Sequence, residues 1–231
     1  MIGKLIVVEG TDCSGKETQT RKLIERLNNE NIPTQRLSYP MYDTPTGRII
    51  GACYLGKDYL CQEYFKENKP WFEDASKVDP YTASLYYAAD RKYNNYLIEE
   101  LLNKGTNVIL DRYVDSNLAH QGGKYANEEE QLKFFNDIEY LEYNINKIKK
   151  PDMTLFLYMP YDYALELKKH RNELPDAHEK SKEHLLNAEK TYLRLAQLHD
   201  YNTINCVKDN TIRSIEDINE EVYQKVKKLI K

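Results

Sequence analysis

Short apolar segments alternate along this chain with longer segments in which apolar residues recur every three or four positions. A short apolar run predicts a buried strand, and the longer period predicts a helix that packs one face against a sheet. Strands are expected at Leu5–Val8, Thr34–Ser38, Asn107–Leu110, Thr154–Tyr158 and Thr203–Val207. Helices are expected at Thr18–Asn29, Tyr81–Asn103, Glu128–Ile148, Tyr161–His170, Lys182–Leu198 and Ile215–Ile230. The alternation predicts an α/β fold, with helices on both faces of a five-stranded parallel sheet.

Two charged segments interrupt this alternation, at Asp58–Lys77 and at Arg171–Ser181. Neither has the composition of a linker between domains, and the chain contains no internal repeat. We therefore expect residues 1–231 to form a single domain with two insertions.

The charge balance, the apolar runs and the cysteines indicate which partners and which compartment to expect. The 231 residues include 33 basic and 37 acidic side chains, so a nucleic-acid backbone is not expected as a partner. No apolar run approaches the length of a transmembrane helix, so no membrane partner is expected either. The four cysteines are scattered without metal-binding spacing, which favours free thiols in a cytoplasmic protein.

A glycine-rich segment directly follows the first expected strand. It has the pattern Gly10-x-x-x-x-Gly15-Lys16 and leads into an expected helix. The glycines let successive backbone N–H groups turn toward one anion, and the lysine and the helix dipole add positive charge. A glycine-rich turn without a ligand is the weaker alternative. The pattern predicts a nucleotide phosphate site made by Gly10, Thr11, Asp12, Cys13, Ser14, Gly15, Lys16, Glu17 and Thr18.

An acid and a base stand at the carboxyl end of the third expected strand. Ligands of open parallel sheets bind beyond this edge, where the first strand also delivers its glycine-rich loop. There Asp111 could hold Mg²⁺ through water, and Arg112 could bind a phosphate with two hydrogen bonds. An Asp that caps the next turn and pairs with the Arg is an equally weighted alternative.

Two further segments carry groups suited to a nucleoside monophosphate. Tyr87 and Arg91 lie four residues apart on an expected helix, so a ring that stacks on a base and a guanidinium share one face. Taken alone, a core tyrosine beside a surface arginine is the better reading. The segment Ser116–Gly123 is expected to be a polar loop able to read a base edge, although such loops are usually only solvated turns. Its His120 is expected to be a contact residue and not a catalytic base.

Together these segments resemble the thymidylate kinase family. The matching segments cover nearly the whole chain and follow one another in the same order as in the family. The discriminating matches are Asp111-Arg112-Tyr113 with Ser116, Asn117 and Ala119, and the helix Tyr87-Ala88-Ala89-Asp90-Arg91. The other matches are Glu9-Gly10-Thr11-Asp12 with Gly15-Lys16, Tyr39-Pro40-Met41-Tyr42, Thr46-Gly47-Arg48, Pro151-Asp152-Met153-Thr154-Leu155, and Asp176-x-His178-Glu179.

The resemblance implies a P-loop NTPase fold and transfer of the γ-phosphoryl group of ATP to dTMP, with Mg²⁺ as cofactor. It also implies a homodimer and a lid segment near residues 171–181. The other charged segment, near 58–77, is expected to be an insertion in the same domain. The implied catalytic residues are Lys16, Arg112, Arg171 and Asp12. The implied acceptor-binding residues are Asp12, Tyr42, Arg48, Tyr87, Arg91, Arg112, Asn117, His120 and Gln121. The implied metal ligands are Asp12 and, on weaker grounds, Glu179 and Asp111.

The chain departs from the family pattern at three places. Glu17 stands where a Ser or Thr usually binds Mg²⁺, and we expect its carboxylate to face away from the phosphates because it would repel them. Met41 stands where many members have Arg, which removes one charge near the acceptor phosphate. The phosphate loop itself contains no Arg, so Arg171 in the lid is the expected source of the catalytic charge.

Other functions remain open from the sequence. A deoxynucleoside kinase or another nucleoside monophosphate kinase shares this fold, although a deoxynucleoside kinase needs a carboxylate after the second strand, where this chain has Tyr39-Pro40-Met41-Tyr42. A P-loop ATPase or regulatory protein would have no use for the pair Tyr87 and Arg91. Within the family resemblance, the choice between dTMP and dUMP is also undecided.

Overall fold

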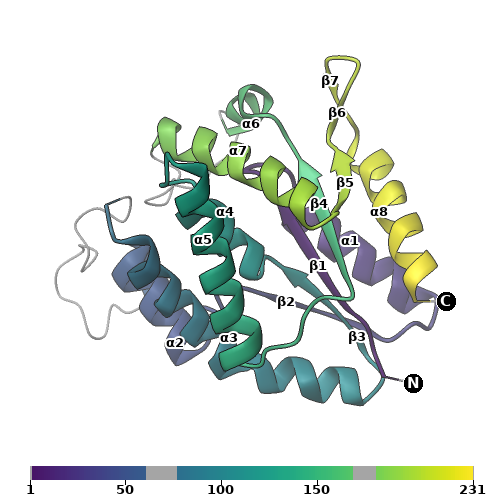
Figure 1. Cartoon of the computed structure of the whole chain (residues 1–231). Helices are drawn as coiled ribbons and strands as arrows, with labels where there is room; N and C mark the ends of the chain where they lie inside the picture. The colour runs from purple at the N-terminus through teal and green to yellow at the C-terminus, as the bar shows by residue number, and fades with distance from the viewer. Residues whose placement is uncertain (1, 61–76, 169–180, 231) are drawn as a thin grey trace.

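A five-stranded parallel sheet runs through the centre of the molecule (Figure 1). The computed structural model describes residues 2–60, 77–168 and 181–230. The strands lie in the order β2-β3-β1-β4-β5. Their bounds are β1 Leu5–Gly10, β2 Thr34–Ser38, β3 Asn107–Asp111, β4 Met153–Tyr158 and β5 Asn202–Asn205. The predicted sheet is confirmed, with small shifts at the strand ends.

Helices cover both faces of this sheet because its central strands are apolar on both sides. In β1, Leu5 and Val7 face one core, whereas Ile6 and Val8 face the other. The first core is closed by α3 (Pro80–Asn103), α4 (Val114–Gly122), α5 (Glu128–Glu139) and α7 (Lys182–Leu198). The second is closed by α1 (Lys16–Asn29), α6 (Tyr161–Lys168) and α8 (Ile215–Leu229). Strands buried on both faces read as continuous apolar runs, which is why the sequence located them.

Helix α4 corrects the expectation of a polar loop at Ser116–Gly123. Its residues are buried except His120, which is half-buried. Val114, Leu118 and Ala119 pack in the first core, and its polar side chains are buried as well. A helix without a solvated face has no amphipathic period, so the sequence pattern could not reveal it.

The segment after β2 folds as helix α2 (Pro45–Arg48), followed by a π-helical segment at Ile49–Tyr54 and a 3₁₀ turn at Asp58–Leu60. Only the resemblance, and no periodicity, indicated a helix here. Gly47 is required because a Cβ at this position would lie 2.0 Å from the carbonyl oxygen of Met41. Buried Asp90 of α3 accepts hydrogen bonds from the Met41 N–H (2.9 Å) and the Thr46 hydroxyl (2.7 Å), which attaches the segment to α3.

Two other boundaries differ from the expectation. Strand β5 ends at Asn205, and Val207 instead begins the short hairpin β6 (Val207–Lys208) and β7 (Thr211–Ile212). The helix expected to reach Ile148 is α-helical only to Glu139 and continues as a π-helical segment, Tyr140–Ile145. None of the helices in the described residues has the length and apolar composition needed to cross a bilayer.

Candidate active site

The glycine-rich loop between β1 and α1 is folded around the ammonium group of Lys16. Lys16 Nζ donates to the carbonyl oxygens of Gly10 (2.8 Å) and Thr11 (2.9 Å). Gly15 adopts a left-handed conformation, with φ of 78°, immediately before the helix. The Thr11 hydroxyl donates to the carbonyl of Met159 (2.7 Å) and accepts from its N–H (2.9 Å). The loop is therefore held between its own lysine and the end of β4.

The surroundings of Lys16 lower its pKa. Burial lowers the pKa of this ammonium group to about 8, assisted by the positive charge of Arg112 and opposed by Asp12, Asp111 and Glu9. Without a bound ligand, Lys16 therefore loses its proton at a pH at which ordinary lysines remain fully charged.

Glu17 lies on the outer side of α1. Its side chain is 62% exposed, and its Oε1 atom is 2.8 Å from Nη2 of Arg21, one turn along the helix. This is the outward orientation expected from charge repulsion. Thr18 is also exposed. Both follow Lys16 on the first turn of α1.

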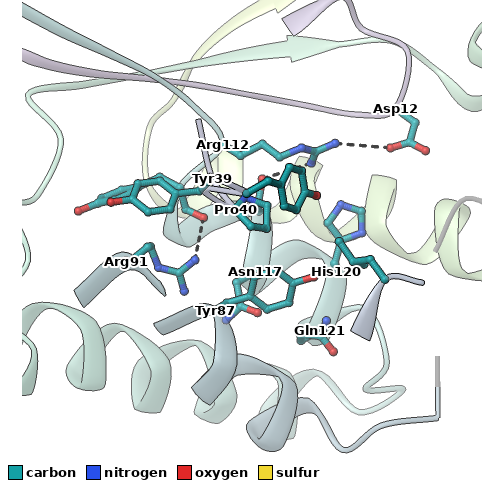
Figure 2. Close-up of a pocket in the computed structure, with 13 residues that line it drawn as sticks. Asp12, Tyr39, Pro40, Tyr87, Arg91, Arg112, Asn117, His120 and Gln121 are labelled. Atoms are coloured by element: carbon teal, nitrogen blue, oxygen red, sulfur yellow. Dashed lines mark hydrogen bonds and ion pairs between the residues drawn. The ribbon is translucent and has the colours of Figure 1, made fainter. Parts of the chain in front are cut away.

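A pocket of about 660 Å³, open to solvent, lies beside the loop (Figure 2). The loop, the segment after β2, α3 and the β3–α4 connection all contribute to its walls. The lining residues are Asp12, Tyr39, Pro40, Tyr42, Leu55, Tyr87, Arg91, Arg112, Tyr113, Ser116, Asn117, His120 and Gln121. All the residues expected to bind the acceptor line this pocket except Arg48, which is exposed on α2.

Arg112 stands where the loop and the pocket meet. Its Nη2 atom is 4.0 Å from Oδ1 of Asp12, and its Nη1 donates to the hydroxyl of Ser116 at 3.4 Å. Its backbone is left-handed, with φ of 68°, which is uncommon for a residue with a side chain. Figure 2 shows Asp12 and Arg112 at one end of the pocket and Tyr87 and Gln121 on the opposite side.

Arg91 lines the pocket from a buried position. It is 2% exposed, and its guanidinium forms an ion pair with Glu142 and donates to the carbonyl of Tyr113 (3.4 Å). The sequence suggested an arginine with a charge available for a phosphate; here Glu142 neutralises that charge, so Arg91 presents oriented N–H groups instead. No local sequence pattern indicated Glu142 as this partner, because it lies 51 residues from Arg91.

Polar groups with unused hydrogen-bonding capacity lie on the wall formed by α4. Neither the amide nitrogen nor the amide oxygen of buried Asn117 has a hydrogen-bond partner. The amide oxygen of Gln121, Oε1, also has none. Gln121 Nε2 donates to the Tyr54 hydroxyl (3.3 Å), and the Tyr54 ring meets the Tyr87 ring edge-on, with centroids 5.8 Å apart. Since buried polar atoms are normally paired, this wall suits a flat ligand that offers a donor and an acceptor.

Three other expected site residues are not brought into this arrangement. Asp111 forms an ion pair with Arg36 at 2.5 Å and does not line the pocket. Arg171 and Glu179 lie outside the described residues. Within the described part of the chain, no three His, Cys, Asp or Glu side chains are grouped so that they could hold a metal ion by themselves.

Comparisons with known proteins show which family the chain resembles. A family model described as thymidylate kinase matches residues 66–222. The chain is 31% identical to the thymidylate kinase of Prochlorococcus marinus (strain NATL2A), covering 100% of this chain and 99% of the relative. It is 29% identical to the thymidylate kinase of Plasmodium falciparum (isolate 3D7), covering 98% and 91%. Among solved structures, the thymidylate kinase of Candida albicans has the same fold, with a TM-score of 0.72, 23% identity, and coverage of 98% and 92%.

The lowered pKa of Lys16 predicts a pH dependence of ATP use. Below about pH 8 the free enzyme holds the charged ammonium that attracts phosphates, and above it the charge is lost. We expect kcat/KM for ATP to fall as pH rises through this pKa, because this ratio reports the free enzyme. The fall in kcat at saturating ATP should occur at higher pH, since bound phosphates favour the charged form. In Lys16→Arg, whose guanidinium stays protonated, the fall in kcat/KM should vanish; its persistence would contradict the assignment.

Proposed function

This chain belongs to the thymidylate kinase family and is a phosphotransferase, and on that premise we propose how its residues transfer the γ-phosphoryl group of ATP to dTMP. The products are dTDP and ADP. The observation that carries the proposal is the position of Arg112, which lines the pocket and lies 4.0 Å from Asp12 of the phosphate loop. Phosphoryl transfer depends mainly on positioning and charge neutralisation, so two adjacent anion sites meet its main requirement. We propose that residues 1–231 act as a single kinase domain.

The donor is assigned to the glycine-rich loop. The ATP phosphates would replace the carbonyl oxygens of Gly10 and Thr11 as partners of Lys16. The backbone N–H groups of residues 10–18 and the start of α1 would supply the remaining donors. Arg171 is proposed as the source of transition-state charge, on sequence grounds alone.

The acceptor is assigned to the pocket. Arg112 is placed to bind its phosphate, and the Tyr87 ring to stack on its base. The unpaired amide of Asn117 can accept from one position of a pyrimidine-dione base edge and donate to the next. Arg91, His120, Gln121 and Tyr42 complete the walls around the nucleoside. No general base is needed, because the acceptor phosphate is already an anion near neutral pH.

We propose Mg²⁺ as the metal that accompanies ATP. Mg²⁺ usually binds through one or two carboxylates together with substrate phosphates and water. The carboxylate of Asp12 fits this requirement, because Asp12 belongs to the phosphate loop and also lines the pocket. Asp111 fits less well, since Arg36 already occupies its carboxylate. When bound, the ion would neutralise phosphate charge.

A deoxynucleoside kinase is the main alternative enzyme. That reaction needs a carboxylate near the 5′-hydroxyl to accept its proton. Among the described residues, the pocket is lined by one carboxylate, Asp12, which lies in the phosphate loop and not after β2. The pocket therefore favours an acceptor that already carries a phosphate.

We propose a homodimer formed through α3. Its exposed side carries Leu85, Tyr93 and Tyr96, each more than half exposed, within about a quarter turn of one another. An apolar stripe of this kind on one helix is typical of an interface between subunits.

The first prediction concerns the acceptor. Among nucleoside monophosphates, dTMP should give the highest rate of ADP release. Tyr87→Ala should weaken dTMP binding by about 1–3 kcal/mol, the value of base stacking on an aromatic ring, while KM for ATP changes little. Tyr86→Ala, on the same helix outside the pocket, is the matched control. Failure of every monophosphate to stimulate ATP turnover would instead indicate an ATPase or regulatory protein.

The second prediction concerns Glu17. Because its carboxylate faces solvent and pairs with Arg21, Glu17→Ser should leave kcat and the Mg²⁺ requirement nearly unchanged. Titration of Mg²⁺ at fixed ATP would measure both. A fall in kcat of about a hundredfold that higher Mg²⁺ restores would identify Glu17 as a metal ligand.

The third prediction concerns the dimer. Leu85→Glu would place a charge on the exposed α3 stripe and should convert the dimer to a monomer in sedimentation velocity. Leu132→Glu, at an exposed apolar position on α5, is the matched control and should remain dimeric. A parent protein that sediments as a monomer at micromolar concentration would contradict the proposed dimer.

A further inference from the structure

A fully buried carboxylate, Glu9, lies at the end of β1, one residue before the glycine-rich loop. Its Oε1 atom accepts from the backbone N–H groups of Tyr113 (2.7 Å) and Ser116 (3.1 Å). Its Oε2 atom accepts from the hydroxyls of Ser116 (2.5 Å) and Tyr192 (3.1 Å). Glu9 thus joins three elements: the first strand, the start of α4, and α7.

The hydrogen bonds around Glu9 extend to Arg112. The Ser116 hydroxyl that donates to Glu9 is also the oxygen that accepts from Arg112 Nη1 (3.4 Å). The backbone N–H of Arg112 donates to the carbonyl of Val8 (3.1 Å), the residue before Glu9. The unusual left-handed backbone of Arg112 is followed directly by the Tyr113 amide, which donates to Glu9. Strained residues of this kind persist where the surrounding contacts determine them.

We propose that Glu9, through Ser116 and with Tyr192, is a positioning residue for Arg112 in the reaction. The proposal rests on the proposed contact between Arg112 and the acceptor phosphate. Two acceptor oxygens on Glu9 turn the Ser116 proton toward the carboxylate. A lone pair of the Ser116 oxygen then faces Arg112, while the Tyr192 hydroxyl, whose oxygen lies 2.9 Å from that of Ser116, gives its one proton to Glu9. Chains of hydrogen bonds strengthen one another in this way when their directions agree.

The substitution Glu9→Gln tests the direction of these hydrogen bonds, because it changes the side chain's shape very little. The two backbone N–H groups must keep the amide oxygen of the glutamine on their side. Its NH₂ group would then face the hydroxyls of Ser116 and Tyr192 and donate to them. The Ser116 proton would have to turn away from residue 9, toward the Tyr192 oxygen or toward Arg112, where it opposes another donor, and the negative charge that acts on Arg112 would be lost. The guanidinium should therefore be held less firmly, while the rest of the pocket is unchanged.

The readout is the ratio of two dissociation constants, for dTMP and for thymidine, measured by calorimetry. Only dTMP carries the phosphate that Arg112 is proposed to bind. We expect Glu9→Gln to lower the preference for dTMP over thymidine about tenfold, as for one lost hydrogen bond to a charged group, and thymidine affinity to stay unchanged. Tyr192→Phe removes a single hydroxyl and should lower the ratio less, about threefold. Tyr223→Phe, which loses a hydroxyl bonded to Glu30 just after α1, is the matched control.

Arg112→Met separates this inference from the proposed function. If Arg112 binds the acceptor phosphate, Arg112→Met alone lowers the ratio, and adding Glu9→Gln to it lowers the ratio no further. An undiminished effect of Glu9→Gln in that background would overturn the positioning role and leave the proposed function standing. An unchanged ratio in Arg112→Met would overturn both. Equal losses for dTMP and thymidine would make Glu9 a purely structural residue; if Glu9→Gln does not fold, Tyr192→Phe decides by the same ratio.

Discussion

The parallel pairing of β1 with β3 determines where everything else in the site lies. In this register Val8 is opposite Asp111, so Gly10 and Arg112 leave the sheet at the same edge within a few residues of each other. Strand β2 joins the same edge, with Ser38 opposite Asp111. The glycine-rich loop, Arg112 and the wall after β2 therefore converge without any long connection. This is the usual location of ligand sites in open parallel sheets.

The charged groups around this edge are buried, and each has a compensating partner. Arg91 forms an ion pair with Glu142, and Lys16 donates hydrogen bonds to backbone carbonyl oxygens. Glu9 accepts hydrogen bonds from four donors. A buried charge without such a partner would cost several kcal/mol. This pairing explains how the site can hold several charges before any substrate arrives. It also keeps these groups in fixed positions, which is what catalysis by positioning requires.

Helix α4 connects the glycine-rich loop with the pocket. Its Ser116 amide is held by Glu9, which precedes the loop, and its later residues, Asn117 and Gln121, line the pocket. Polar residues thus fill positions that would be apolar in an ordinary core helix. The free energy of burying them is recovered through hydrogen bonds with Glu9 and Tyr54, and the unpaired amide of Asn117 is left for a ligand.

Local sequence patterns determined the strands, most helices, the glycine-rich loop and most of the residues that line the pocket. These features depend on apolar periodicity and on short motifs, both of which are properties of neighbouring residues. The sequence did not predict α4 from periodicity, the exposed position of Arg48, or the partners Glu142, Glu9 and Tyr192. Each of those depends on contacts between segments far apart in the chain, 51 residues for Arg91 with Glu142 and 183 for Glu9 with Tyr192. Only the folded sheet brings such groups together, because hydrogen bonds and ion pairs act over a few ångströms and leave no period in the sequence.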